Sequence, residues 1–204
     1  MARRQQEKSQ QTREELMLSA EEVFGRKGFD AATIAEITDH AGYAKGSFYR
    51  YWKSKDDIFL AIMEARMREY RRSRQQGLEE ASCLDDVLHV IVDFLETIID
   101  DEQWSKVFLE FTIHAFGKDE IKKKLNRKSY RLSTELFSQI LAPFIYPSAQ
   151  TRKLGAVVIA VFEGFLIQQF LNTNMLSKDD LRQTILFLGH QFLQPTPSLR
   201  KELP

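Results

Sequence analysis

Hydrophobic residues recur every three or four positions along most of the chain. Over residues 84–100 this spacing places Val87, Leu88, Ile91, Phe94, Leu95 and Ile98 on one face of a helix. No run of strictly alternating apolar and polar residues stands beside a hairpin turn. The pattern predicts an all-α protein of about nine helices, over residues 12–27, 34–41, 45–51, 55–76, 84–100, 103–116, 119–141, 149–171 and 178–193.

Helix-start signals support these assignments. In a capping box, a hydroxyl or carboxylate side chain accepts a backbone N–H at the helix start, and an acid three residues later reaches back. Five pairs have this spacing or its acidic variant: Thr12 with Glu15, Thr33 with Glu36, Ser54 with Asp57, Ser82 with Asp85, and Ser177 with Asp180. Five such pairs in one chain indicate a succession of separate helices.

Charge is distributed unevenly along the 204 residues. The chain has 29 Lys or Arg and 29 Asp or Glu, so its formal net charge is zero. Residues 1–75 hold 15 basic and 12 acidic side chains, whereas residues 76–204 hold 14 and 17. The asymmetry favours an anionic partner at the N-terminal end.

Cysteine and histidine usage argues against a metal site or a disulfide. Cys83 is the only cysteine, and no Cys/His cluster has zinc spacing. We therefore expect no metal and no other cofactor. A single cysteine also suits a reducing cytoplasm.

One segment raises the question of a membrane span. Residues 154–171 carry a single charge, Glu163, over a length close to that of a bilayer span. Glycines and glutamines interrupt the segment, and a helix apolar on nearly all sides can instead be buried between protein layers. The N-terminus lacks the apolar core of a signal peptide. We expect a cytoplasmic protein that does not enter a membrane.

Residues 33–52 have the pattern of a helix-turn-helix motif. Ile34 and Ile37 form the inner face of the first short helix, and Phe48 and Trp52 form that of the second. Gly42 lies where a tight turn can need a positive φ. In this motif the second helix lies in the major groove of DNA. Polar and basic residues then face outward, and Gly46 lets the backbone approach a partner closely.

Residues 12–59 resemble the DNA-binding domain of the tetracycline-repressor (TetR) family. The matching positions are Thr12-Arg13-Glu14, Ala20, Phe24, Gly28-Phe29, Thr33, Ile34, Ile37, Ala41-Gly42, Lys45-Gly46, Phe48-Tyr49 and Ser54-Lys55. The resemblance implies an N-terminal helix-turn-helix domain over residues 1–53, joined by a long helix to a C-terminal ligand-binding and dimerisation bundle over residues 54–204.

The family's DNA contacts can be carried over residue by residue. The resemblance implies that Lys45, Ser47 and Arg50 face bases. It also implies that Thr33, Tyr43, Tyr49 and Lys55 hold phosphates. Ala44 departs from the family, which usually has Ser or Thr at the start of the recognition helix, so we expect a side-chain cap to be missing there.

Aromatic residues are frequent in the C-terminal part, where the resemblance implies a cavity for an effector. Plain core packing is the alternative for each of them. An effector site of apolar walls with a few polar groups would use Trp104, Phe108, Phe111, His114, Tyr130, Phe137, Phe165 and Gln169. Because the chain has 15 phenylalanines, we expect a small, largely apolar effector.

The last two predicted helices are apolar on more than one face and need a second layer. A homodimer formed through them would bury Val158, Phe162, Leu186 and Phe187. Two-fold symmetry then predicts a palindromic operator whose half-sites lie about one helical turn, or 34–36 Å, apart.

Together these patterns favour a repressor that an effector releases from DNA. Two alternatives are an enzyme and a helical protein-interaction module. The four histidines are scattered, and no nucleophile motif, phosphate loop or dinucleotide fingerprint occurs. The basic outer face of residues 45–55 argues against the interaction module.

Overall fold

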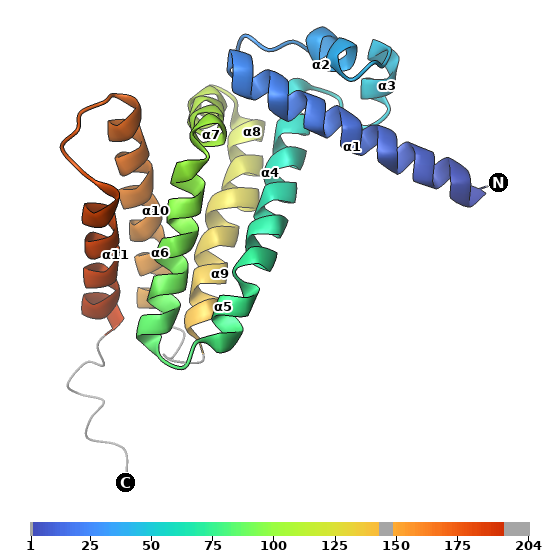
Figure 1. Cartoon of the computed structure of the whole chain (residues 1–204). Coiled ribbons are helices and arrows are strands. Elements are labelled where there is room, and N and C mark those ends of the chain that lie inside the picture. Colours follow the sequence, from blue (N-terminus) through green and yellow to red (C-terminus); the bar gives the residue numbers. More distant parts are fainter. Residues whose placement is uncertain (1, 143–148, 194–204) are drawn as a thin grey trace. The chain divides into compact units, whose positions relative to one another are not determined.

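The computed structural model describes residues 2–142 and 149–193. Within these two ranges the chain forms eleven α-helices and one π-helical turn, and no strand (Figure 1). The prediction of an all-α fold is therefore confirmed. The elements are α1 (Ala2–Lys27), α2 (Ile34–His40), α3 (Lys45–Tyr49), α4 (Lys55–Ser73), α5 (Gln75–Glu80), α6 (Leu84–Asp100), α7 (Glu102–Phe116), α8 (Asp119–Leu125), η1 (Asn126–Tyr130), α9 (Arg131–Leu141), α10 (Ala149–Phe170) and α11 (Lys178–Leu193).

The chain divides into two compact units. Unit 1 comprises Met1–Arg71 and Asp101–Lys128, and unit 2 comprises Arg72–Asp100 and Ser129–Pro204. The predicted boundary between residues 53 and 54 divides a DNA-binding part from a ligand-binding and dimerisation part. The division into compact units does not test that boundary, so it stays a prediction.

An aromatic cluster forms the core of unit 1. The ring of Phe59 in α4 stacks on Phe111 and Trp104 of α7, with ring centroids 4.0 and 5.2 Å apart. It also meets Phe24 and Phe29 edge-on, at 5.9 and 5.5 Å. All five side chains are buried. Because such rings bury large apolar areas, we expect this cluster to contribute strongly to the stability of unit 1.

A charged network lies beside this cluster. Arg66 of α4 pairs with Glu21 of α1 and donates to Asp101 Oδ2 at 2.5 Å. Its guanidinium also lies over the Trp104 ring, 4.5 Å from the centroid. The cation is thus paired with two carboxylates and one aromatic face, which compensates its partial burial.

Unit 2 is a bundle in which α10 packs against α9 and α11, and α6 packs against α5, α9 and α11 (Figure 1). Two glycines permit close helix contacts. A Cβ at Gly189 in α11 would lie 2.7 Å from Leu88, and one at Gly155 in α10 would lie 3.2 Å from Phe137. Cys83, just before α6, is exposed.

Helix α1 begins ten residues earlier than predicted, and the capping box at Thr12 is wrong. Thr12 is buried in the middle of α1, where its hydroxyl donates to the carbonyl oxygen of Lys8 at 3.0 Å. A mid-helix threonine commonly makes this bond to the residue four positions earlier. The residues before Thr12 include no glycine or proline, so nothing stops the helix there.

The other helix starts agree with the sequence prediction, with one shift of partner. Thr33 and Glu36 form a complete capping box. The backbone N–H of Asp57 donates to the Ser54 hydroxyl at 3.2 Å, and that of Asp180 does so to Ser177 at 3.2 Å. At Ser82 the acid is Asp86 rather than Asp85. The backbone and hydroxyl of Ser82 together hold the pKa of Asp86 at about 2.

Two predicted helices are divided in the structure. The segment 55–76 ends as α4 at Ser73, and α5 begins at Gln75. The segment 119–141 is interrupted by η1, whose wider π turn separates α8 from α9. A π turn is closed by i→i+5 hydrogen bonds and is only a single turn long, and periodicity averaged over the whole segment does not resolve so short an interruption.

One described helix is long and apolar enough to cross a membrane, at Thr151–Phe170, and 33% of its hydrophobic window is buried within the structure. One such helix is weak evidence for a membrane span, because a core helix can have the same length and composition.

Candidate nucleic-acid interface

The second and third helices form a helix-turn-helix unit on α1. Ile37 of α2 and Phe48 of α3 are fully buried, and the rings of Phe48 and Trp52 lie 5.5 Å apart. The hydroxyl of Ser19 in α1 donates to the carbonyl oxygen of Ile37 at 2.7 Å. The inner faces predicted from the sequence are therefore the packed faces.

The turn between α2 and α3 depends on Gly42. Its φ is +73°, in the left-handed region that glycine adopts at little cost. The backbone N–H of Tyr43 donates to the carbonyl oxygen of Thr38 at 2.8 Å and closes the turn. The next residue, Ala44, is the N-cap of α3 and makes no side-chain cap hydrogen bond, as its apolar side chain predicts.

Burial of Phe48 turns the other side of α3 outward. Lys45, Gly46 and Arg50 are exposed, Tyr49 is 51% exposed, and Ser47 is half-buried. The Arg50 guanidinium lies 5.9 Å from the centroid of the Tyr51 ring. This face offers an ammonium, a guanidinium and two hydroxyls, which are groups that read base edges or hold phosphates.

Thr33 begins α2 and is exposed. Its hydroxyl accepts the backbone N–H of Glu36 at 3.2 Å, and the Glu36 carboxylate accepts the backbone N–H of Thr33 at 3.0 Å. Glu36 also pairs with Lys27 of α1. Lys27 and Thr33 together hold the pKa of Glu36 at about 2. The start of α2 is thereby tied to the end of α1.

Two tyrosines tie α3 and its turn to the early part of α1. The Tyr43 hydroxyl donates to Glu15, and the Tyr51 hydroxyl donates to the carbonyl oxygen of Ser9 at 2.9 Å. The contact at Ser9 was not predicted, because the predicted helix started at residue 12. Tyr51, the last residue of the predicted helix 45–51, was a signal for it.

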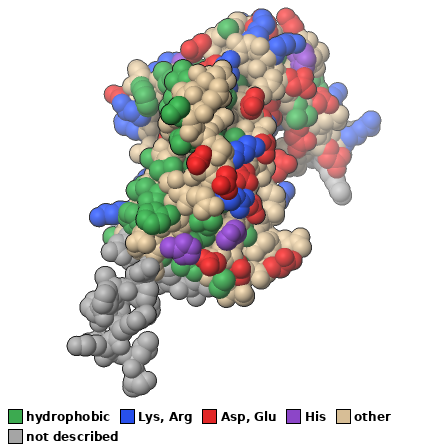
Figure 2. Space-filling model, turned by 60° about the vertical axis from the view of Figure 1, so that its left-hand side comes forward, with side chains coloured by type: hydrophobic (Ala, Val, Ile, Leu, Met, Phe, Trp, Pro, Cys, Tyr) green, Lys and Arg blue, Asp and Glu red, His purple; other side chains and the backbone are tan. Residues whose placement is uncertain are grey.

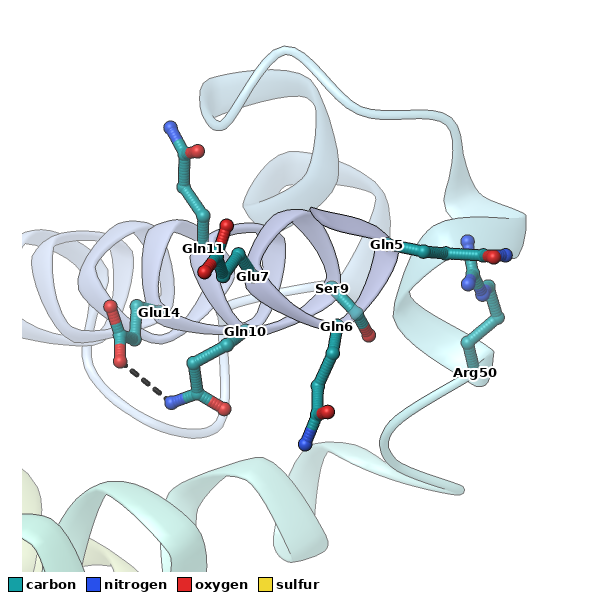
Figure 3. Close-up of a pocket in the computed structure, with 8 residues that line it drawn as sticks. All are labelled: Gln5, Gln6, Glu7, Ser9, Gln10, Gln11, Glu14 and Arg50. Carbon is teal, nitrogen blue, oxygen red and sulfur yellow. Dashed lines mark hydrogen bonds between the residues drawn. The ribbon is translucent and has the colours of Figure 1, made fainter. Parts of the chain in front are cut away.

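Beyond these contacts the first three turns of α1 and Arg50 line an open groove of about 820 Å³. Figure 3 shows the Gln5 side chain reaching toward the Arg50 guanidinium, while the other side chains point outward from α1. The groove is lined by Gln5, Gln6, Glu7, Ser9, Gln10, Gln11, Glu14 and Arg50. The lining contains two carboxylates and one guanidinium, so the groove is no basic channel for phosphates.

Lys55, at the start of α4, points into the protein rather than away from it. Its ammonium donates to the carbonyl oxygens of Phe29, Asp30 and Ala32, at 2.6, 2.9 and 2.9 Å. Burial lowers the pKa of Lys55, and the nearby Asp30 and Asp56 oppose that effect. The phosphate contact predicted for Lys55 thus competes with an internal role.

The helix-turn-helix region is similar to known proteins. A model described as bacterial regulatory proteins, tetR family, matches residues 16–62. The HTH-type transcriptional repressor BepR of Brucella suis biovar 1 is 30% identical over 149 residues, which are 70% of this chain and 67% of BepR. The chain belongs to the TetR family. It is therefore an HTH-type transcriptional regulator from a family whose members bind DNA.

Two further similarities are to proteins described as transcriptional regulators. The transcriptional regulator YfiR of Bacillus subtilis is 27% identical over 134 residues, and the chain spans 62% of its length. The crystal structure of FadR from Bacillus subtilis, in complex with stearoyl-CoA, has a TM-score of 0.64 at 15% identity. That alignment covers 88% of this chain and 98% of FadR, and at this identity it shows the fold alone.

Gly46 offers a direct test of close approach between this TetR-family helix and DNA. A Cβ added there meets no atom within 4 Å, so the protein itself does not need glycine at this position. Gly46→Ala is expected to stabilise α3 by about 0.5–1 kcal/mol. It is also expected to weaken DNA binding, because the added methyl group would stand between the backbone and the DNA. Thermal unfolding and DNA titration check the two effects. Gly117→Ala, equally open, is the control, and equal DNA affinities of both variants would contradict the prediction.

The eight predicted effector residues of this TetR-family chain are divided between the units. In unit 1, Trp104 and Phe111 are buried in the aromatic cluster, and Phe108 is half-buried. His114 lies with Nε2 at 2.7 Å from Asp56 and Nδ1 at 3.3 Å from Asp30. Core packing and polar contacts with Asp56 and Asp30 account for these four positions, and ligand contacts by these side chains stay predictions.

In unit 2, Phe137 and Phe165 are buried, and Tyr130 is half-buried. The Tyr130 hydroxyl donates to Glu163 Oε1 at 2.6 Å. Gln169 is exposed, and its amide donates to the carbonyl oxygen of Leu176 at 3.0 Å. In the sequence Glu163 is the single charge of residues 154–171, and the structure gives it a polar partner inside unit 2.

Glu163 predicts a pH-dependent stability. Burial raises its pKa, while the hydrogen bond from Tyr130 opposes the rise. A folded-state pKa above the unfolded value favours folding at low pH, and this contribution is lost as the pH rises through the folded pKa. Glu163→Gln is therefore expected to gain stability over the parent where the Glu163 carboxyl ionises, and none in acid where that carboxyl is protonated in both the folded and the unfolded state. Thermal unfolding from acid to neutral pH checks it. Glu135→Gln, on the exposed side of α9, is the control.

The predicted interface residues differ in exposure. Val158 and Phe162 of α10 are buried, Leu186 is half-buried, and Phe187 of α11 is 62% exposed. Other large apolar side chains of unit 2 also reach the surface: Ile167, Leu171, Met175 and Leu176. Figure 2, in which the side bearing α10 and α11 comes forward, shows hydrophobic side chains among the polar ones on that face.

Proposed function

We propose that this protein is a repressor that binds a specific DNA sequence as a homodimer and leaves it when a small, largely apolar effector binds. The observation that carries the proposal is the outer face of α3. There Lys45 and Arg50 are exposed beside Tyr49, on a helix fixed from behind by Phe48 and Trp52. A rigid helix that presents basic and hydroxyl groups is suited to the major groove.

The contacts divide by chemistry. Lys45, Ser47 and Arg50 read base edges, because Arg and Lys pair with guanine and a hydroxyl suits several bases. Thr33, Tyr43 and Tyr49 hold phosphates and fix the register on the duplex. Residues 1–53 are the DNA-binding domain in this proposal. Residues 54–204 carry the effector site and the dimer contacts, and the protein acts in the cytoplasm without a membrane.

The dimer is proposed to form through α10 and α11. The exposed apolar side chains of Phe187 on α11, Ile167 on α10, and Leu171, Met175 and Leu176 between these helices support it, because a surface of this kind is costly in water. Two-fold pairing presents two recognition helices to successive major grooves, so the operator is a palindrome with half-sites about 34–36 Å apart.

The effector is proposed to bind beside the aromatic side chains of unit 2, Phe137 and Phe165, with Tyr130 and Gln169 toward its polar end. The similarity in fold to a regulator crystallised with stearoyl-CoA supports an apolar effector and makes that acyl-CoA the first probe. Binding of effector and DNA must weaken each other by the same factor, because the coupling between two sites is reciprocal.

The experiment is selection of binding sites from a random duplex pool by the purified protein at moderate salt. A recovered palindrome supports a dimeric, sequence-specific regulator. Weak, salt-sensitive binding without sequence preference would contradict a specific operator, and no binding at all would contradict DNA as the partner. Release of the recovered duplex by stearoyl-CoA, with free coenzyme A as the control, then tests the effector class.

A further inference from the structure

The turn between α1 and α2 is held from both sides by charged side chains of unit 1. It starts at Gly28, whose φ is +81°, and leads into Thr33, the N-cap of α2. The backbone N–H of Phe29 donates to Glu110 Oε2 of α7 at 2.7 Å. A Cβ at Gly28 would lie 2.7 Å from the same carboxylate oxygen. The carboxylate is therefore packed closely against the start of the turn.

Lys55 takes up the carbonyl side of the same turn. Its three hydrogen bonds go to Phe29, Asp30 and Ala32, within a stretch of four residues. An ammonium group has three N–H donors, so all of them are used internally. Its Nζ also lies 4.5 Å from the centroid of the buried Phe29 ring. No proton of the ammonium remains for a phosphate while these three bonds are made.

We propose that Lys55 is a positioning residue for DNA binding, which holds the Phe29–Ala32 turn and through it the start of α2, and that it does not contact a phosphate. The inference rests on the proposed function, since positioning for DNA presumes that DNA is bound. Thr33 follows Ala32 directly, so a turn released by Lys55 would displace the residue proposed to meet phosphate at the start of α2.

The two roles predict opposite results for arginine at this position. A guanidinium binds phosphate at least as well as an ammonium, so arginine would preserve a phosphate contact. The guanidinium is planar, with its donors in a rigid fork, and cannot direct three N–H groups from one nitrogen to three converging carbonyl oxygens. Lys55→Arg therefore separates a phosphate contact from a hold on the turn.

The salt dependence of binding provides the second distinction. Each phosphate contact contributes about 0.9 to the slope of log affinity against log salt concentration. Loss of a positioning residue lowers the population of the binding-competent arrangement and leaves that slope unchanged. Lys53→Met is the matched control, because it removes the same charge two positions away from an exposed side chain.

The experiment measures the affinity of the Lys55→Met, Lys55→Arg and Lys53→Met variants for the duplex recovered by site selection, over a range of salt and below the unfolding temperature. We expect both Lys55 variants to lose about 10-fold or more in affinity, as for lost hydrogen bonds to a charged group. We expect their slope of log affinity against log salt concentration to equal that of the parent protein. If Lys55→Met does not fold, Lys55→Arg alone decides between the roles.

Three results would overturn the inference. The first is parental affinity in Lys55→Arg, and the second is a slope lowered by about 0.9 per contact in Lys55→Met. The third is unchanged affinity in folded Lys55→Met that unfolds earlier, since Lys55 would then be only structural. Hydrogen exchange at the Phe29 amide gives a readout without DNA. We expect faster exchange in both Lys55 variants and not in Lys53→Met. If the parent protein binds no duplex, the proposed function is contradicted, and the exchange measurement still tests whether Lys55 holds the turn.

Discussion

Replacing Phe59 by alanine is expected to lower the free energy of unfolding by about 3–5 kcal/mol, the range for a buried phenylalanine. The Phe59 ring contacts four other aromatic rings in the core of unit 1, so its removal leaves a cavity that rigid rings cannot refill. Urea unfolding followed by circular dichroism measures the change, at one protein concentration because association adds to stability.

The control for this prediction is Phe116→Ala, in which a side chain that is 66% exposed on α7 is removed. A change within about 0.5 kcal/mol is expected there, as for most surface substitutions. Similar losses in the two variants would show that the aromatic cluster is not the stabilising centre of unit 1.

The second large effect is expected on DNA binding. Lys45→Ala combined with Arg50→Ala is expected to lower affinity for the selected duplex by about 10²–10⁴-fold, since each contact to a base edge contributes about 1–3 kcal/mol. The two side chains are exposed, so the fold should be unchanged. Fluorescence anisotropy with the labelled duplex, beside a thermal unfolding curve, measures both quantities.

Arg68→Ala combined with Lys106→Ala is the matched control for charge. Both side chains are exposed in unit 1, on α4 and α7, and lie outside the helix-turn-helix unit. The control also removes two positive charges, but from another part of the surface, so any loss of DNA affinity in it reflects long-range attraction alone. If the two double variants lose equal affinity, the face of α3 does not read the duplex.

Local patterns predicted the elements of this protein well where the signals in the sequence did not conflict. The helix at 84–100 has the predicted bounds because its apolar periodicity and its start signal agree. The inner faces of α2 and α3 followed from Ile37 and Phe48. The helix start at residue 12 failed because the Thr12 hydroxyl can cap a helix or bond back to Lys8, and the sequence does not distinguish these uses.

The roles of individual side chains were harder to predict, because they depend on contacts distant in sequence. Lys55 has the position of a phosphate-binding residue in the family, but its partners lie 23–26 residues earlier in the chain. Trp104 and Phe111 have the composition expected of either a ligand site or a core, and the structure packs them with Phe59. Only the folded arrangement distinguishes such roles.

Cys83 makes the dimer question accessible to spectroscopy. It is the only thiol in the chain, and it is exposed at the start of α6. A nitroxide attached there requires no prior removal of other cysteines and gives one label per protomer. A two-fold dimer would then yield a single interlabel distance by pulsed electron paramagnetic resonance. The same distance, followed while effector or DNA is added, would report the movement of one protomer against the other in the unmutated protein.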